Sequence, residues 1–249
     1  MKGSDSVLPL AQAEAEEFMH AYPEKSVSVT GGGSGVGIAA LIDKQVNVAT
    51  ASREMTTDEI KKANSNGINP VKHVIATDGI TVIVNPKNPI SKLTFDQLRG
   101  IYDGSISNWK EVGGEDKPIA VISRDSSSGT YKDFKDDVGF KEYRADSLTQ
   151  ATTGGIVSEV TQNPNAIGYI GFAYVNKDVK VLSVDKGKGA VVPTSKTISS
   201  GEYPLSRTLQ IYTNGEPSGL IKEFSDFMLS QKGQDVVSKV GYVPLNKLN

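Results

Sequence analysis

The chain has 249 residues, a formal net charge of −2 and 37% hydrophobic residues, so it can bury one or two substantial cores. Because it has no basic surplus, it lacks the electrostatic footprint of a nucleic-acid-binding protein. The absence of cysteine excludes a thiol nucleophile, a cysteine-ligated metal site and disulfides, and two histidines argue against a histidine-rich metal site. No apolar run approaches about 20 residues, so the sequence predicts no membrane-spanning helix.

The chain begins with small polar residues in front of a helical pattern. Gly3-Ser4-Asp5-Ser6 precedes a segment from Leu10 to His20 that is typical of a helix. Since Met1 and Lys2 lead almost directly into this turn, we expect a mature chain with an added start methionine. A leader and part of the first strand would then be missing from it.

A glycine-rich turn follows, between a predicted strand from Val27 to Thr30 and a predicted helix from Ile38 to Lys44. The turn is Gly31-Gly32-Gly33-Ser34-Gly35-Val36-Gly37, and its glycines allow backbone N–H groups to approach a ligand closely. Ala51-Ser52-Arg53 stands in the same way before a helix predicted from Thr56 to Ala63. Both segments therefore place hydroxyl groups at a helix start.

Two strands are predicted next, from Val71 to Ala76 and from Ile80 to Asn85, with Thr77-Asp78-Gly79 as an interruption. Asp-Gly is common in hairpin turns, so Asp78 is interpreted either as a turn residue or as a site residue at a domain crossing. Leu93 to Tyr102 predicts a helix, with Thr94 as its N-cap and Gln97 in the capping-box position.

The most informative segment is Ser123-Arg124-Asp125-Ser126-Ser127-Ser128-Gly129-Thr130. It lies between an apolar run from Pro118 to Ile122, which predicts a buried strand, and a helix predicted from Tyr131 to Asp137. The N–H groups and dipole of a helix N-terminus favour an anion. Ser128 and Thr130 add hydroxyl donors, and Arg124 adds a guanidinium that matches a tetrahedral oxyanion. Taken alone, the segment is equally typical of an ordinary hydroxyl N-cap.

The remainder of the chain continues the alternation of strands and helices, which favours an α/β fold. The absence of an obvious linker is explained by two domains that the chain crosses twice, near Ile80–Asn85 and Ser206–Tyr212. The predicted segments are strands at Ile167–Tyr174, Val179–Val184 and Leu209–Tyr212, a surface loop at Lys186–Thr197, and a helical region at Ser218–Lys239 with Gly233 as its point of division.

Four helix starts carry hydroxyl groups or arginine, and one shared anion site accounts for them better than separate caps do. Two enzyme interpretations compete. Gly35 to Ala40 fits a loose dinucleotide-binding pattern with Glu54 about twenty residues on, but that pattern leaves the Arg124 cluster unexplained. Gly32-Gly33-Ser34-Gly35-Val36 lacks the final glycine of a hydrolase nucleophile elbow. We therefore expect a binding protein, not an enzyme, with no cofactor.

In their order, these motifs resemble the substrate-binding proteins of ABC-type phosphate importers, over nearly the whole chain. Two pieces typical of that family contain no expected ligand residue: Leu93–Leu98 running to Ser107-Asn108-Trp109, and Asn165–Tyr169. The other pieces that carry the resemblance are Gly3-Ser4-Asp5-Ser6-Val7-Leu8-Pro9, Gly31-Gly32-Gly33-Ser34-Gly35, Ala51-Ser52-Arg53, Asp78-Gly79 and Arg124–Thr130.

The resemblance implies an α/β, bilobal Venus-flytrap periplasmic-binding-protein fold, with two lobes joined by a two-strand hinge and the ligand in the cleft. We expect residues 1–82 and 207–249 to form lobe 1 and residues 83–206 to form lobe 2. The implied function is capture of inorganic phosphate in the periplasm or at the extracellular face of the membrane. The phosphate would pass to the permease subunits of an ABC importer. A monomer is expected, and a lipid anchor on the precursor fits this location.

The resemblance also implies roles for particular residues. Ser128, Gly129 and Thr130 match a hydrogen-bonding segment of the second lobe, and Arg124 matches an arginine that binds phosphate oxygens. Ser6 and Val7 match donors of the first loop, to within one residue of register. The expected phosphate ligands are Ser6, Val7, Ser34, Ser52, Asp78, Arg124, Ser128, Gly129 and Thr130, with Asp5, Gly35 and Arg53 as supporting or additional ligands.

Two positions depart from the better-known branch of the family. There, an aspartate that accepts the phosphate proton follows Ala-Ser, whereas this chain has Arg53, and Ser126 stands where an acid orients the arginine. We therefore assign the proton acceptor to Asp78, with Asp5 as the second choice. Arg53 is expected to enter the pocket or to pair with a carboxylate such as Asp78.

The alternative ligand is another tetrahedral oxyanion, sulfate or molybdate, bound by the same fold. Arg124 and a carboxylate acceptor favour phosphate, because hydrogen phosphate carries a proton and sulfate carries none. A secreted scavenger or signalling protein without a transporter is equally compatible with the sequence.

Overall fold

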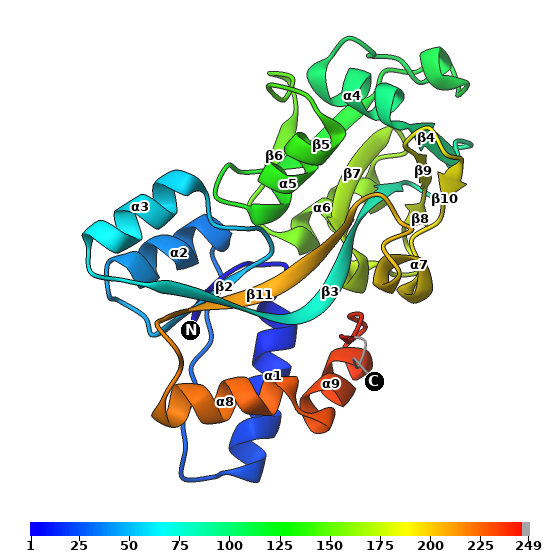
Figure 1. The fold of residues 1–249 in the computed structure, drawn as a ribbon. Coiled ribbons are helices and arrows are strands. Elements are labelled where there is room, and N and C mark those ends of the chain that lie inside the picture. The colour runs from blue at the N-terminus through cyan, green and yellow to red at the C-terminus, as the bar shows by residue number, and fades with distance from the viewer. Residues whose placement is uncertain (246–249) are drawn as a thin grey trace. The chain divides into compact units, whose positions relative to one another are not determined.

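The computed structural model describes residues 1–245, and the chain divides into two compact α/β units (Figure 1). Unit 1 contains Met1–Asp78, Ser127–Gly129 and Arg207–Asn249, and unit 2 contains Gly79–Ser126 and Thr130–Ser206. The first boundary thus follows Asp78, whereas the sequence placed it after residue 82, and the sequence did not assign Ser127–Gly129 to unit 1. No helix within residues 1–245 combines the length and the apolar composition that a membrane crossing requires.

Unit 1 is built on a short sheet. β1 (Lys2–Gly3) pairs in parallel with β2 (Val48–Ala51), which pairs antiparallel with β11 (Ser206–Asn214). In Figure 1, α2 (Ser34–Ile42) and α3 (Thr57–Ser65) lie on one side of these strands. On the other side lie α1 (Leu8–Ala21), α8 (Gly219–Leu229) and α9 (Gln231–Lys239).

Each face of this sheet has its own apolar core. Ile38 of α2 belongs to a buried cluster with Ala49 of β2 and Met55. On α1, the Phe18 ring lies 5.1 Å from the ring of Phe224 and 5.6 Å from that of Phe227 on α8, measured between centroids. Because buried apolar area stabilises by about 25 cal/mol per Å², both faces hold the strands in place. The loops that follow the strands are therefore anchored on a rigid base.

Unit 2 contains a larger and a smaller sheet. β7 (Ala166–Gly171) lies between β3 (Pro70–Val84), which is antiparallel to it, and β5 (Ala120–Arg124), which is parallel. The remaining strands are β6 (Leu148–Gln150) beside β5, β8 (Lys180–Val181) beside β3, and the small sheet of β10 (Ala190–Val191), β9 (Ser183–Asp185) and β4 (Lys92–Thr94). The helices are α4 (Phe95–Asp103), α5 (Gly129–Val138), α6 (Thr153–Gln162) and α7 (Ser195–Ser199), with 3-10 turns at Trp109–Val112 and Phe172–Tyr174.

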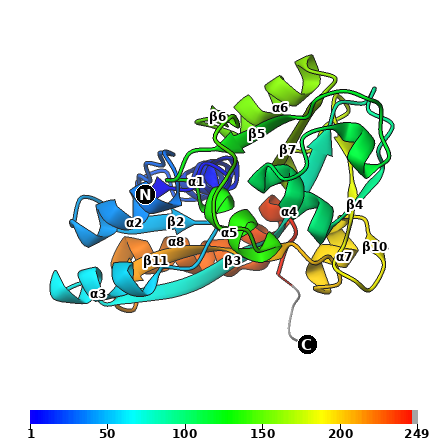
Figure 2. The same ribbon diagram turned by 90° about the horizontal axis from the view of Figure 1, so that it is seen from above.

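Two long strands, β3 and β11, carry the chain from one unit to the other. They are neighbours in the strand order and run side by side in Figure 2. The passage lies between Asp78 and Gly79 in β3, and between Ser206 and Arg207 in β11. The predicted crossings, Ile80–Asn85 and Ser206–Tyr212, overlap these strands.

The capping box predicted for α4 is confirmed. Thr94 caps this helix: its hydroxyl accepts from the Gln97 N–H at 3.1 Å, and the Gln97 side chain accepts from the Thr94 N–H at 2.9 Å. Trp109 is buried, and its indole N–H donates to Asn165 O at 2.9 Å. The hydrogen bond from Trp109 to Asn165 thus joins the two family-typical segments within unit 2.

Two strand predictions were wrong. Val27–Thr30 is not a strand, because β1 is only two residues long and offers a single bridge, from Lys2 to Thr30. Thr77-Asp78-Gly79 does not interrupt β3, which is continuous from Pro70 to Val84. Backbone partners on both sides of Asp78 explain this continuity: Thr77 N–H donates to Val243 O at 2.8 Å, and Ile80 N–H donates to Leu205 O at 2.9 Å.

Helix boundaries also differ from prediction. The C-terminal helical region divides at Ser230 and not at Gly233, because the Ser230 hydroxyl caps α9 by accepting from the Gly233 N–H at 3.2 Å. The predicted loop Lys186–Thr197 contains β10 and the start of α7. Gly171 ends the strand predicted to reach Tyr174, and the two helices nearest the candidate site begin earlier than predicted, α2 at Ser34 and α5 at Gly129.

Replacing Gly233 with alanine should lower the free energy of unfolding by about 3 kcal/mol, because α9 packs directly on the last turn of α8. A Cβ atom at Gly233 would lie 2.5 Å from Met228 O and closer still to Phe227 O. Urea denaturation measures the change. Gly154→Ala in α6 is the control, since a Cβ atom there meets nothing within 4 Å, and equal stabilities of the two variants would contradict the expectation.

Candidate functional site

The glycine-rich turn places Ser34 at the start of a helix. Gly33, which precedes α2, has a φ of 109°, a left-handed backbone angle that favours glycine. Its N–H donates to Gly3 O at 2.9 Å, so the turn lies against the first loop of the chain. Ser34 is buried and is the first residue of α2. Its hydroxyl therefore lies at the end of the helix where backbone N–H groups and the helix dipole favour an anion.

Two buried serines from different segments form a pair. Ser52, which directly follows β2, donates its N–H to Ser34 Oγ at 3.1 Å, and the two hydroxyl oxygens are 3.3 Å apart. Both side chains are 0% exposed. Whichever hydroxyl donates within this pair, the other retains an O–H for which the described residues supply no acceptor. A buried hydroxyl donor of this kind needs a hydrogen-bond acceptor, such as the oxygen of a bound anion.

A third segment, Ser127–Gly129, packs against this pair. Gly35 N–H donates to Ser127 O at 3.1 Å, which fixes the segment on the glycine turn. A Cβ atom at Gly129 would lie 2.5 Å from Ser52 Oγ and closer still to Ser34 Oγ, so only glycine fits there. Because Gly129 is the first residue of α5, the first residues of two helices, α2 and α5, meet at the serine pair.

The first loop lies beside the glycine turn. A Cβ atom at Gly31 would lie 3.8 Å from Asp5 Oδ1, which places this carboxylate next to the turn. Ser6 is 3% exposed, and its carbonyl accepts from the Tyr242 hydroxyl at 2.7 Å. The Val7 N–H, which the sequence assigns to the ligand, donates to Ser4 O at 3.2 Å. Among the donors of this loop, the Ser6 hydroxyl therefore remains the stronger candidate ligand.

Asp78 is buried and paired with an arginine that the sequence analysis did not single out. Its Oδ2 accepts from Arg207 Nε at 3.0 Å and from Arg207 Nη2 at 2.8 Å. The two side chains are 1% and 6% exposed. The hairpin-turn interpretation of Asp78 is wrong, because the residue lies within the continuous strand β3.

Arg53 pairs with a carboxylate, as one expectation for it stated, and the partner found is Glu59. Its Nη1 and Nη2 donate to the two carboxylate oxygens of Glu59, at 2.8 and 2.7 Å. Burial raises the pKa of Glu59, but hydrogen bonds from Arg53 and Thr56, together with the positive charge of Arg53, outweigh it and hold this pKa below its ordinary value. A Cβ atom at Gly35 would lie 3.4 Å from Arg53 Nη2, so Arg53 borders the glycine turn as a supporting residue.

Strand β11 fixes the loop that carries Ser52 and Arg53. The Gln210 side-chain amide donates to Arg53 O at 2.5 Å. The Tyr212 hydroxyl donates to Glu54 Oε2 and accepts from the Met55 N–H, both at 3.1 Å. Because Arg207 of the same strand holds Asp78, β11 supports two of the expected ligand positions.

In unit 2, Arg124 lies at the end of β5 and is 3% exposed. Its guanidinium donates to Thr153 Oγ1 and to Ala151 O, both at 3.0 Å. The Tyr169 hydroxyl accepts from the Arg124 N–H at 3.3 Å and bonds to Ser123 Oγ at 2.8 Å. Burial raises the pKa of Tyr169 to about 12, so its hydroxyl stays protonated at neutral pH. The start of α6 thus holds the Arg124 side chain, and Tyr169 holds its backbone.

The structure therefore brings Ser34, Gly35, Ser52 and Gly129 into one contact cluster, with Asp5 and Arg53 beside the glycine turn. Ser128 and Thr130 are both 2% exposed. Sequence reasoning missed the residues that hold the expected ligands. They are Arg207, Gln210, Tyr212, Glu59, Tyr169 and Thr153.

Comparisons with known proteins agree with this organisation. A family model described as a PBP superfamily domain matches residues 1–232. The chain is 32% identical over 250 residues to the phosphate-binding protein PstS of Bacillus subtilis (strain 168), covering 100% of this chain and 81% of that relative. It is 33% identical to PstS of Borreliella burgdorferi, covering 97% of this chain and 88% of the relative.

Solved structures give the same result. One from Clostridium perfringens, described as a phosphate ABC transporter substrate-binding protein with bound phosphate, superposes with a TM-score of 0.90 at 37% identity over 98% of both chains. An ABC-type phosphate transport receptor from Vibrio cholerae gives a TM-score of 0.81 at 33% identity, covering 97% of this chain and 98% of the other.

Two α/β units between which the chain passes repeatedly, with a buried site rich in hydroxyls and glycine, define a substrate-binding protein of the Venus-flytrap type. The chain belongs to the PBP superfamily and, within it, to the phosphate-binding proteins of the PstS type. The family expected from the sequence motifs is thereby confirmed.

Proposed function

We propose that this protein captures inorganic phosphate outside the cytoplasmic membrane and delivers it to the permease of an ABC importer. One observation carries the proposal: the buried pair of Ser34 and Ser52, which keeps an O–H to donate and lies where α2 and α5 begin. Relatives named for phosphate binding support the choice of ion.

The site suits a small, dehydrated oxyanion. Hydroxyls and first-turn N–H groups at the starts of α2 and α5 replace the water that the ion loses on binding. Ser6, Val7 and Ser128 add further donors, and Arg124 and Thr130 of unit 2 complete the shell when the ligand is held. Asp78 accepts the phosphate proton. Residues 1–82 with 207–249, and residues 83–206, then act as the two lobes that respond to the ligand.

The proposal includes partners and location. The protein works as a monomer in the periplasm or at the extracellular face of the membrane, with the permease subunits as its protein partners. A lipid anchor on the precursor would keep it near the importer. Retention of the precursor in a detergent phase, and its release after treatment that removes lipids, would support the anchor.

Calorimetric titration of ligand-stripped protein tests the function. Phosphate should give saturable heat at one site per chain, whereas sulfate and molybdate at equal concentration should give none. Ser34→Ala should weaken phosphate binding by about tenfold or more, since a hydrogen bond to a charged group contributes about 1.5–3 kcal/mol. Ser65→Ala is the control, because that exposed hydroxyl bonds only within α3, to Lys61 O. Equal binding of sulfate and phosphate would favour the alternative of a general oxyanion binder.

A further inference from the structure

The ion pair of Asp78 and Arg207 lies where β3 leaves unit 1 and β11 enters it. Asp78 is the last unit 1 residue of β3, and Arg207 is the first unit 1 residue of β11. Both belong to the same unit, so their contact is a property of that unit alone. Arg207 lies in the same alternating row of β11 as Leu209 and Ile211, which are buried. An arginine in an apolar row of a strand indicates a specific buried partner.

The geometry of the pair distinguishes the two carboxylate oxygens. Nε and Nη2 of Arg207 both donate to Oδ2, at 3.0 and 2.8 Å. Two charge-assisted N–H donors on one oxygen hold the carboxylate in a defined orientation. Arg207 therefore fixes how Asp78 presents its carboxylate to a hydrogen-bond donor.

We infer that Arg207 is a positioning residue for ligand selectivity: it holds Asp78 as an acceptor, so that the site takes an oxyanion that carries a proton and rejects one that does not. The inference rests on the proposed function, in which Asp78 meets the phosphate. A buried carboxylate without its cation takes up a proton and becomes a donor. A protonated carboxyl group can donate a hydrogen bond to sulfate as well as to phosphate. An ionised carboxylate repels sulfate and finds no proton on that ion from which to accept a hydrogen bond.

The test compares phosphate and sulfate binding by calorimetry in four variants: Arg207→Gln, Arg207→Lys, Asp78→Asn and the double variant Asp78→Asn/Arg207→Gln. The measured quantity is the ratio of the two dissociation constants. Arg207→Gln should reduce the preference for phosphate by about tenfold or more. Arg207→Lys keeps the cation but loses the fork of two N–H donors, so its ratio should lie between those of the wild type and Arg207→Gln. A role in packing alone would weaken both anions equally and leave the ratio unchanged.

The double variant keeps the inference testable even if Arg207→Gln does not fold, because it removes both members of the pair. If Arg207 acts through Asp78, the double variant and Asp78→Asn should discriminate equally. A ratio unchanged in folded Arg207→Gln, or ratios that differ by more than about threefold between the double variant and Asp78→Asn, would overturn the inference.

Arg144→Gln is the matched control. Arg144 also makes two hydrogen bonds to one aspartate, Asp146, at 2.6 and 2.8 Å, but both residues belong to unit 2. Its removal should leave the selectivity ratio unchanged. Failure of the proposed function looks different from failure of this inference. In the former case the wild type itself shows no preference for phosphate, whereas in the latter the wild type discriminates and Arg207→Gln still does.

Discussion

Replacing Gly129 with alanine is expected to weaken phosphate binding by about a hundredfold or more while the protein remains folded. The added methyl group would overlap the hydroxyl oxygens of Ser34 and Ser52. Because both residues are buried, they can yield only by moving apart or by displacing the start of α5. Either movement takes two donors out of position. Each hydrogen bond to a charged ligand contributes about 1.5–3 kcal/mol, and each 1.4 kcal/mol is about tenfold in affinity.

Gly154→Ala is the matched control for this prediction. Gly154 also lies in the first turn of a helix, α6, and a Cβ atom there meets nothing within 4 Å. Calorimetric titration should therefore give wild-type affinity for Gly154→Ala. Circular dichroism of both variants separates loss of the site from loss of the fold. Wild-type phosphate affinity in folded Gly129→Ala would show that the contact of Gly129 with the two serines does not belong to the binding site.

Local sequence signals predicted the elements whose boundaries depend on neighbours in the chain. Thr94 and Gln97 identify the start of α4 because both halves of a capping box lie within one turn. The serine- and glycine-rich segments were found in the same way, since a hydroxyl or glycine at a helix start is itself a local pattern. The sequence predicted that these segments meet in one site only because four helix starts with hydroxyl groups or arginine needed a common explanation.

Partners brought by distant strands could not be predicted in this way. Glu59, which pairs with Arg53, is only six residues away, yet no local pattern identified it, and Asp78 was named only as an example of a carboxylate partner. Arg207 lies 129 residues from Asp78, and only the pairing of strands brings the two together. The signal that could have identified Arg207 is its place in an apolar row of β11, where a lone cation requires a buried anion.

The same reasoning explains the error at Asp78. Asp-Gly is a strong local turn signal, but β3 continues through it because Val243 and Leu205 supply backbone partners on either side. Tertiary pairing thus outweighs turn preference at the point where the chain changes unit. As a result, an aspartate is held within a strand by an arginine of the neighbouring strand and is not exposed at a loop.

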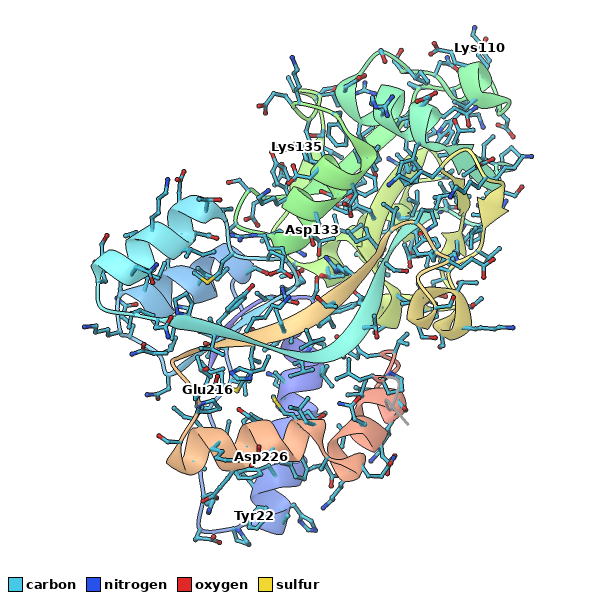
Figure 3. All side chains as sticks on the ribbon, viewed as in Figure 1. Tyr22, Lys110, Asp133, Lys135, Glu216 and Asp226 are labelled. Carbon is cyan, nitrogen blue, oxygen red and sulfur yellow. The ribbon has the colours of Figure 1, made fainter. Side chains whose placement is uncertain are left out.

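One buried acid in unit 1 has no role in the proposed site. Glu14 is 1% exposed and lies in the buried stripe of α1, between Leu10 and Phe18. Its Oε2 has no hydrogen-bond partner among the described residues. By contrast, Asp226 on α8 is exposed and pairs with Lys222 at 2.6 Å (Figure 3). Burial, and secondarily the negative charge of Glu17, raises the pKa of Glu14 from 4.5 to about 9.

Glu14→Gln should therefore stabilise the protein at neutral pH, by about 2–3 kcal/mol at pH 7. Below pH 4.5 the side chain is protonated in both folded and unfolded chains, so it causes no pH dependence there. Above that pH the unfolded chain loses the proton while the folded chain keeps it, so stability falls as pH rises towards about 9. Glutamine has the same shape as glutamate but does not ionise, so the variant does not lose stability in this way as the pH rises.

Urea denaturation at several pH values between 4.5 and 9 would measure the effect as a difference between wild type and variant. The two should be nearly equal at the acidic end and should diverge steadily as pH rises, with the variant the more stable. Glu16→Gln is the control, because that side chain lies on the same helix but is exposed, and it should follow the wild type throughout. A constant difference between wild type and Glu14→Gln across this range would mean that Glu14 ionises alike in the folded and unfolded chains. The buried position would then be stabilised by a contact of the carboxylate and not by its proton.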